Sequence, residues 1–207
     1  SPLTALSPLD GRYAGKLAPL RSLFSEYGLI RHRLVVEVRW LEQLSRSAAV
    51  PEVALLSEKA HAYLDRLLTD FSETDAEEVK AIEARTNHDV KAVEYFLKDA
   101  VTTEPELAAV AEFIHFACTS EDINNLAYAL ILKSARHDLL TPGTDQLIAD
   151  LSELAGTTTD LPMLARTHGQ PASPTTLGKE ITNVIARLHR ARRSLTEVVL
   201  FGKMNGA

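Results

Sequence analysis

The chain has 207 residues, 45% of them hydrophobic, which is enough to bury a sizeable core in one large or two small domains. The 28 Asp and Glu residues outnumber the 22 Lys and Arg residues, and no basic block is present, which argues against nucleic-acid binding. The single cysteine, Cys118, cannot form an internal disulfide and favours a reducing compartment. Neither a signal-peptide pattern nor an apolar run of membrane-spanning length is visible, so we expect a soluble, cytoplasmic protein.

Apolar residues recur at helical spacing and strand alternation is scarce, which predicts an all-α fold. We expect an N-terminal helical domain over residues 1–108, with residues 1–20 mostly irregular, and the first long helices of a helical bundle over residues 109–207. The expected helices of the first part cover Ile30–Leu41, Val53–Phe71, Asp75–Arg85 and a segment from a cap at Thr86 or Asn87 through Leu97.

In the second part, Thr119-Ser120 is expected to open a helix, and Pro142 to start another that ends near residues 156–159. The last helix is expected from Pro174, with Ser173 as its N-cap, to about Leu200, a length of roughly 40 Å at 1.5 Å per residue. Its apolar residues form a heptad pattern that suits a bundle or a subunit interface. They are Leu177, Ile181, Val184, Leu188, Ala191, Leu195 and Val198.

A histidine in the Gly/Pro-rich segment Arg166–Pro174 is the first candidate for chemistry. Gly169, Pro171 and Pro174 restrict the backbone around His168, so the imidazole is placed for proton transfer or lies in an ordinary exposed connection. Two further histidines stand at helix ends or polar loops, His88 and His115. The remaining four are interpreted as solvated helix residues: His32, His61, His137 and His189.

Two polar segments could bind an anion. Thr119-Ser120 offers hydroxyls at a helix N-terminus, although an ordinary N-cap has the same sequence. Arg12-Tyr13, expected in a turn, could clamp an anion or be plain surface. No His-x-x-x-His pattern and no cysteine cluster is present, so we expect no metal and no cofactor.

Four segments occur in an order typical of one family: Ser7–Tyr13 (SPLDGRY), Thr86–Glu94 (TNHDVKAVE), Thr119–Asn125 (TSEDINN) and Arg166–Ala172 (RTHGQPA). Together they resemble the bacterial-type adenylosuccinate lyases of the fumarase/aspartase superfamily. The resemblance extends to Gly206 and implies that the sequence is an N-terminal portion of a longer chain.

The family resemblance implies a carbon–nitrogen lyase of purine biosynthesis. It would eliminate fumarate from adenylosuccinate to give AMP, and from the succinylcarboxamide intermediate SAICAR to give AICAR. The catalytic residues implied are His168, as general acid, and His88, in support. The substrate-binding residues implied are Arg12 and Tyr13 for the phosphate, Thr119 and Ser120 for the succinyl carboxylate, and Asn87, His88, Asp89, Thr167, Gln170, Lys203 and Asn205.

The sequence departs from the family at one feature. The family supplies its general base from a serine in a Gly-Ser-Ser loop, and these residues contain no such segment. The resemblance also implies three helical domains and a homotetramer whose active sites combine different subunits, with a small-molecule nucleotide substrate and no nucleic-acid or membrane partner. We therefore expect the 207-residue chain alone to be inactive.

Two alternatives remain open at this point. Another lyase of the superfamily, such as an argininosuccinate lyase, would give Arg12 no phosphate to bind. A catalytically silent helical oligomerisation fragment would explain the heptads but not the polar clusters at three helix ends.

Overall fold

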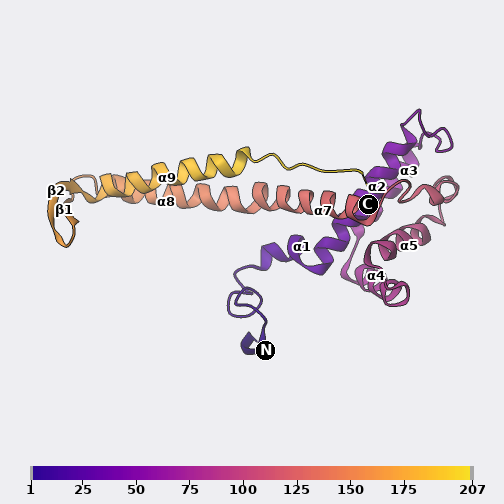
Figure 1. The fold of residues 1–207 in the computed structure, drawn as a ribbon, viewed down its shortest axis with the longest axis horizontal. Helices are drawn as coiled ribbons and strands as arrows, with labels where there is room; N and C mark the ends of the chain where they lie inside the picture. The colour runs from indigo at the N-terminus through magenta and orange to yellow at the C-terminus, as the bar shows by residue number, and fades with distance from the viewer. Residues whose placement is uncertain (1, 206–207) are drawn as a thin grey trace. The chain divides into compact units, whose positions relative to one another are not determined.

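The computed structural model describes residues 2–205 and forms two compact units (Figure 1). Unit 1 contains the chain up to Leu132 together with the segment that starts at Phe201, and unit 2 is Lys133–Leu200. Gly206, the last residue of the family resemblance, lies outside the described residues. The domain division expected after residue 108 stays a prediction.

Unit 1 is helical, as predicted. Its elements are the 3-10 turns η1 (Pro2–Thr4), η2 (Ala18–Leu20) and η3 (Ala111–Phe113), and the helices α1 (Arg21–Phe24), α2 (Glu26–Ser45), α3 (Glu58–Asp70), α4 (Glu73–Thr86), α5 (Asp89–Val101), α6 (Pro105–Ala108) and α7 (Ser120–Ser134), which runs to the boundary of unit 2.

Serine caps set the starts of three of the helices that enclose the core. The hydroxyls of Ser25, Ser57 and Ser72 accept hydrogen bonds from backbone N–H groups in the first turns of α2, α3 and α4. The apolar faces of these helices and of α5 then bury one continuous cluster that includes Leu34, Leu64 and Leu97.

A smaller apolar cluster places the two helix starts that matter for the site. Val36 of α2, Val90 of α5, and Ile123 and Ala127 of α7 are buried together. Because Val90 and Ile123 lie in the first turns of their helices, this contact brings the N-termini of α5 and α7 to the same side of α2.

Three expectations for unit 1 were wrong in detail. Val53 and Leu56 are buried but precede the helix, which starts only after Ser57. Helix α5 is capped by His88, since Asn87 adopts a left-handed conformation (φ 53°) that ends α4. His32 is buried, not solvated, and its Nδ1 lies 2.7 Å from the Gly28 carbonyl oxygen.

Unit 2 is a helical hairpin whose two arms are joined by a two-stranded sheet. It comprises the π-helical segment η4 (Ala135–Leu140), α8 (Thr141–Thr157), β1 (Pro162–Thr167), β2 (Gln170–Thr176) and α9 (Leu177–Glu197), with α8 and α9 side by side (Figure 1). Among the described residues the fold is therefore all-α apart from this antiparallel ribbon, which pairs Thr167 with Gln170.

Two predictions were wrong at this ribbon: the loop around His168 and the Ser173 cap of the last helix. His168 (φ 50°) and Gly169 (φ 78°) form the two-residue turn, and positive φ at both positions matches the turn that fits the strand twist. Pro174 lies in β2, and α9 starts three residues later, where the hydroxyl of Thr176 accepts a hydrogen bond from Lys179 N–H. Pairing with β1 thus replaces the predicted Ser173 cap.

Pro142 does not start a new helix. The helical run continues from α7 through the π-helical segment into α8, where Pro142 lies in the first turn. The wider π-helical turn accommodates a residue that lacks the backbone N–H an α-helix would use.

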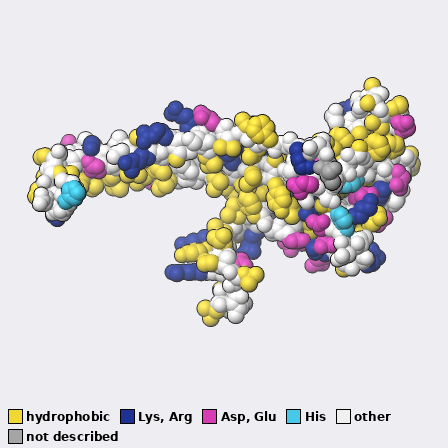
Figure 2. Space-filling model, viewed as in Figure 1, with side chains coloured by type: hydrophobic (Ala, Val, Ile, Leu, Met, Phe, Trp, Pro, Cys, Tyr) yellow, Lys and Arg dark blue, Asp and Glu magenta, His cyan; other side chains and the backbone are white. Residues whose placement is uncertain are grey.

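The heptad pattern of α9 was only partly correct. Ile181 and Leu188 pack with Ile185 against Ile148 and Ala155 of α8, and Ile185 was not in the predicted set. The others include Val184 (48% exposed) and Leu195 (38% exposed). One partner helix covers only one side of the apolar stripe, and Figure 2 shows hydrophobic side chains along the surface of this hairpin.

Among the helices of residues 2–205, none combines the length and the hydrophobicity that a membrane span requires.

Leu34 of α2 offers a test of the core of unit 1. It is 0% exposed, whereas Leu55 is 71% exposed. Leu34→Ala should lower the free energy of unfolding by about 2–5 kcal/mol through lost burial and the cavity left behind. Leu55→Ala should change it by less than about 0.5 kcal/mol. Urea unfolding followed by circular dichroism measures both, and equal effects would contradict this core.

Candidate functional site

A cavity of about 550 Å³ in unit 1 collects several of the predicted site residues. It lies where the start of α5, the loop before α7 and the start of α7 meet, and we call it the His88 cavity. Its lining residues are Thr86, His88, Lys91, Tyr95, His115, Cys118, Thr119 and Ser120.

His88 joins the two helix starts. As N-cap of α5, its Nδ1 accepts a hydrogen bond from Lys91 N–H at 3.1 Å. A neutral imidazole whose Nδ1 accepts carries its proton on Nε2, which then donates to Ser120 Oγ at 3.4 Å. The cap therefore fixes both the orientation and the tautomer of this histidine.

Asp122 organises the start of α7 and holds the C-terminal segment against it. It is a buried residue whose Oδ2 accepts from Thr119 N–H at 3.0 Å. Its Oδ1 accepts from Asn205 N–H at 3.0 Å and from the Lys203 ammonium at 3.2 Å. Lys203 and Asn205, both predicted substrate contacts, are thus brought beside the first turn of α7.

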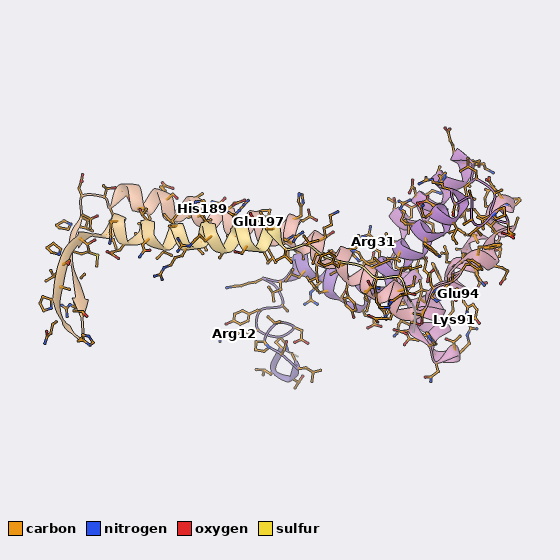
Figure 3. All side chains as sticks on the ribbon, turned by 45° about the horizontal axis from the view of Figure 1, so that its top comes forward. Arg12, Arg31, Lys91, Glu94, His189 and Glu197 are labelled. Carbon is orange, nitrogen blue, oxygen red and sulfur yellow. The ribbon has the colours of Figure 1, made fainter. Side chains whose placement is uncertain are left out.

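Lys91 provides a positive charge at the cavity wall. Its Nζ donates to both carboxylate oxygens of Glu94, at 2.9 and 2.8 Å, and both residues are labelled in Figure 3. The same Nζ lies 5.3 Å from the centre of the Tyr95 ring. Glu94 is nearly buried and also pairs with Lys98 at 3.2 Å. Two ammonium groups therefore share this one carboxylate.

His115 reaches the cavity from the loop before α7. Its Nδ1 lies 2.6 Å from Oε1 of Glu37, whose side chain is 0% exposed. The hydrogen bond to Glu37 raises the pKa of His115 above its usual value, and burial raises the pKa of Glu37. Because the pKa of each residue is raised, the proton that the two side chains share is lost at a higher pH than the proton of a free imidazole.

Four further residues of unit 1 that were predicted for the site do not line the His88 cavity. Asn87 ends α4, and Asp89 pairs with the buried Arg33 at 2.6 Å. Burial has the largest single effect and opposes the ionised form of Asp89, but the charge of Arg33 and the hydrogen bonds to Asp89 together outweigh it, so the pKa of Asp89 is lowered. Arg12, labelled in Figure 3, and Tyr13 belong to the N-terminal turn. The Arg12 guanidinium lies 5.5 Å from the Tyr13 ring centre.

His168, Thr167 and Gln170 belong to unit 2. All three are exposed at the tip of the ribbon, where Thr167 and Gln170 are the last paired residues and His168 is in the turn. The structure therefore brings His88, Thr119 and Ser120 together in one cavity and describes the predicted general acid in the other unit.

Six residues at or behind the cavity were not assigned to the site from the sequence: Thr86, Lys91, Tyr95, His115, Cys118 and Glu37. Lys91 lies inside the family segment at one helical turn from His88, so spacing alone could have indicated it. Glu37 interrupts the apolar run of α2 between Leu34 and Leu41, on the face those residues share. A charge at a core position is a signal that it has a buried partner.

The cavity is suited to an anion. It combines the Lys91 ammonium, two imidazoles and two hydroxyls next to the N-terminus of α7, all of which favour a carboxylate or a phosphate. Within residues 2–205 no group of three or more His, Cys, Asp and Glu side chains is arranged to hold a metal ion.

Residues 11–207 match the sequence pattern of a lyase family, and the chain belongs to that family. The particular relatives agree with the expected resemblance. The chain is 56% identical, over its whole length, to an adenylosuccinate lyase of Escherichia coli (strain K12), and 54% identical to one of Haemophilus influenzae. In each case it spans 45% of the relative's length.

Solved structures support the same fold. A fumarate lyase from Mesorhizobium sp. BNC1 superposes with a TM-score of 0.71 at 23% identity, over 92% of this chain and 42% of that one. A 3-carboxy-cis,cis-muconate lactonizing enzyme from Pseudomonas putida gives a TM-score of 0.69 at 24% identity, over 92% of this chain and 42% of that one.

Cys118 lines the cavity but is not expected to react. Burial, with the charges of Glu37 and Asp122, raises the pKa of the thiol from 9.0 to about 12. At pH 8 this lowers the thiolate fraction about 10³-fold, so alkylation by iodoacetamide should be slower in the native protein than in urea by about that factor. Mass spectrometry of the Cys118 peptide measures both rates, and similar rates would contradict this environment.

Proposed function

We propose that the protein containing this chain is an adenylosuccinate lyase, which eliminates fumarate from adenylosuccinate to give AMP and from SAICAR to give AICAR. The observation that carries the proposal is the convergence of His88, Lys91, Thr119 and Ser120 around one anion-suited cavity. It occurs in a lyase-family chain that is 56% identical to a protein named adenylosuccinate lyase.

The elimination divides into steps that call for these residue types. A base removes a proton from the carbon next to a carboxylate, and the electron pair is held as an aci-carboxylate. The carbon–nitrogen bond then breaks, an acid protonates the departing nitrogen, and the new double bond completes fumarate. Donors at the start of α7 would stabilise the carboxylate as its charge increases, with Thr119 and Ser120 in contact.

The remaining roles follow from the family resemblance. His168 is the general acid, Arg12 and Tyr13 bind the nucleotide phosphate, and a serine outside these residues is the general base. Asn87, Asp89, Thr167, Gln170, Lys203 and Asn205 contact the substrate. The active form is a homotetramer whose sites combine residues of different subunits. In that assembly His168 would serve the site of a neighbouring subunit, and its exposure at the ribbon tip is compatible with this role. This assembly acts in the cytoplasm.

The test uses the full-length protein and measures fumarate release from adenylosuccinate by absorbance. His88→Ala and His168→Ala should each lower kcat/KM by about 10²–10⁴-fold, the usual contribution of a positioned proton-transfer group. His189→Ala, an exposed position on α9, is the matched control and should retain full activity. The 207-residue chain alone should release no fumarate.

Two results would contradict the proposal. If the full-length wild type releases no fumarate, the protein is not an adenylosuccinate lyase. If His88→Ala has unchanged activity, the His88 cavity is not the site of the reaction. Arg12→Ala separates the related lyases, since it should raise KM if the substrate carries a phosphate and leave KM unchanged if it does not.

A further inference from the structure

Helix α2 carries two buried glutamates that each contact a histidine. Glu37 Oε1 lies 2.6 Å from His115 Nδ1, and Glu42 Oε1 lies 2.7 Å from His61 Nδ1. The glutamate side chains are 0% and 6% exposed, so the two pairs are alike in distance and burial. They differ in place, because only His115 lines the His88 cavity.

A contribution to folding stability does not explain why a glutamate occupies the buried position 37. Its Oε2 is buried and accepts no hydrogen bond from the described residues. A buried carboxylate with one oxygen unsatisfied is costly, and an apolar side chain of similar volume at this core position would usually be as stable or more so. Glu42, by contrast, has a second partner in Arg39, at 2.8 Å.

The backbone around His115 is also fixed in an uncommon state. His115 (φ 63°) and Ala117 (φ 58°) both adopt the left-handed conformation, which costs a residue with a side chain about 1–2 kcal/mol. Between them, the Phe116 carbonyl accepts a hydrogen bond from Trp40 Nε1 at 2.8 Å. Two residues of α2 therefore fix this loop: Glu37 bonds to the imidazole of His115, and Trp40 bonds to the loop backbone.

We propose that Glu37 is a positioning residue for the lyase reaction, which orients His115 so that its Nε2 meets an anionic group of the substrate in the His88 cavity. With Nδ1 occupied by Glu37, Nε2 is the ring nitrogen left for a ligand, and no described residue bonds to it. The inference rests on the proposed function, because it assigns a role in that same site.

The charges around His115 determine how it responds to pH. Glu37 faces it from α2, Glu94 and Lys91 from α5, and Cys118 lies in its own loop. The hydrogen bond that His115 donates to Glu37 has the largest effect and raises the pKa of His115, against burial and the charge of Lys91. Removing the charge of Glu37 should therefore lower the pH at which His115 loses its proton.

The experiment compares Glu37→Gln with the matched control Glu42→Gln in the full-length protein. Diethyl pyrocarbonate modifies unprotonated imidazole, so its reaction with the His115 peptide, followed by mass spectrometry across pH, gives the midpoint of that histidine. Glu37→Gln should lower the His115 midpoint by about one pH unit or more. Glu42→Gln should leave it unchanged. An unmoved His115 midpoint in Glu37→Gln would overturn the proposal.

The second readout is the pH profile of kcat/KM for adenylosuccinate. Glu37→Gln should lower kcat/KM by about 10²-fold on the alkaline side and less on the acidic side, where His115 is protonated without Glu37. An equal loss at every pH would indicate a merely structural role and overturn the proposal.

Two further outcomes are separable. If the wild type releases no fumarate, the proposed function fails. The pH midpoints of the His115 reaction then still show whether Glu37 sets the pKa of His115. Should Glu37→Gln fail to fold, Glu37→Asp supplies the test, because its shorter side chain withdraws the carboxylate from Nδ1. The His115 midpoint must then also fall, and an unmoved one contradicts the proposal.

Discussion

The architecture of unit 1 depends on one constraint: α2 carries charged side chains into the interior, and buried charges must be paired. Arg33 bonds to Asp89 at the start of α5 and to Asn124 of α7, Glu37 to His115 of the connecting loop, and Glu42 to His61 of α3. Each partner lies outside α2. These pairs therefore fix which helix ends and loops meet around α2, in addition to the apolar packing.

The His88 cavity is a consequence of that arrangement. Its acidic neighbours are held behind the wall, with Glu94 shared by Lys91 and Lys98 and Glu37 engaged by His115. The groups on the wall are an ammonium, imidazoles and hydroxyls, although the chain as a whole has a formal charge of −6. The fold thus gives an acidic protein a local site for an anion, which the proposed elimination requires because its substrate carries carboxylates.

The sequence predicted the helical fold, because amphipathic spacing is a local signal. His88, Thr119 and Ser120 were assigned to a substrate site only through the family resemblance, and their roles stay a prediction, although the structure has all three lining one cavity. The sequence did not predict the β-ribbon at His168, whose strands gain stability only by pairing with each other, or the start of α5 at His88. Ile185 and the exposed Val184 show the same limit, since a heptad pattern does not state which side a partner covers. Glu37 was visible as a charge among apolar residues, but its partner is 78 residues away.

The most direct test of the central claim is a crystal structure of the full-length protein with AMP and fumarate bound. We predict a fumarate carboxylate at the start of α7, with an oxygen at about 3 Å from the hydroxyls of Thr119 and Ser120, and with His88 beside it. Fumarate bound elsewhere, with Thr119, Ser120 and Lys91 contacting only solvent and protein, would contradict the assignment of this cavity as the substrate site.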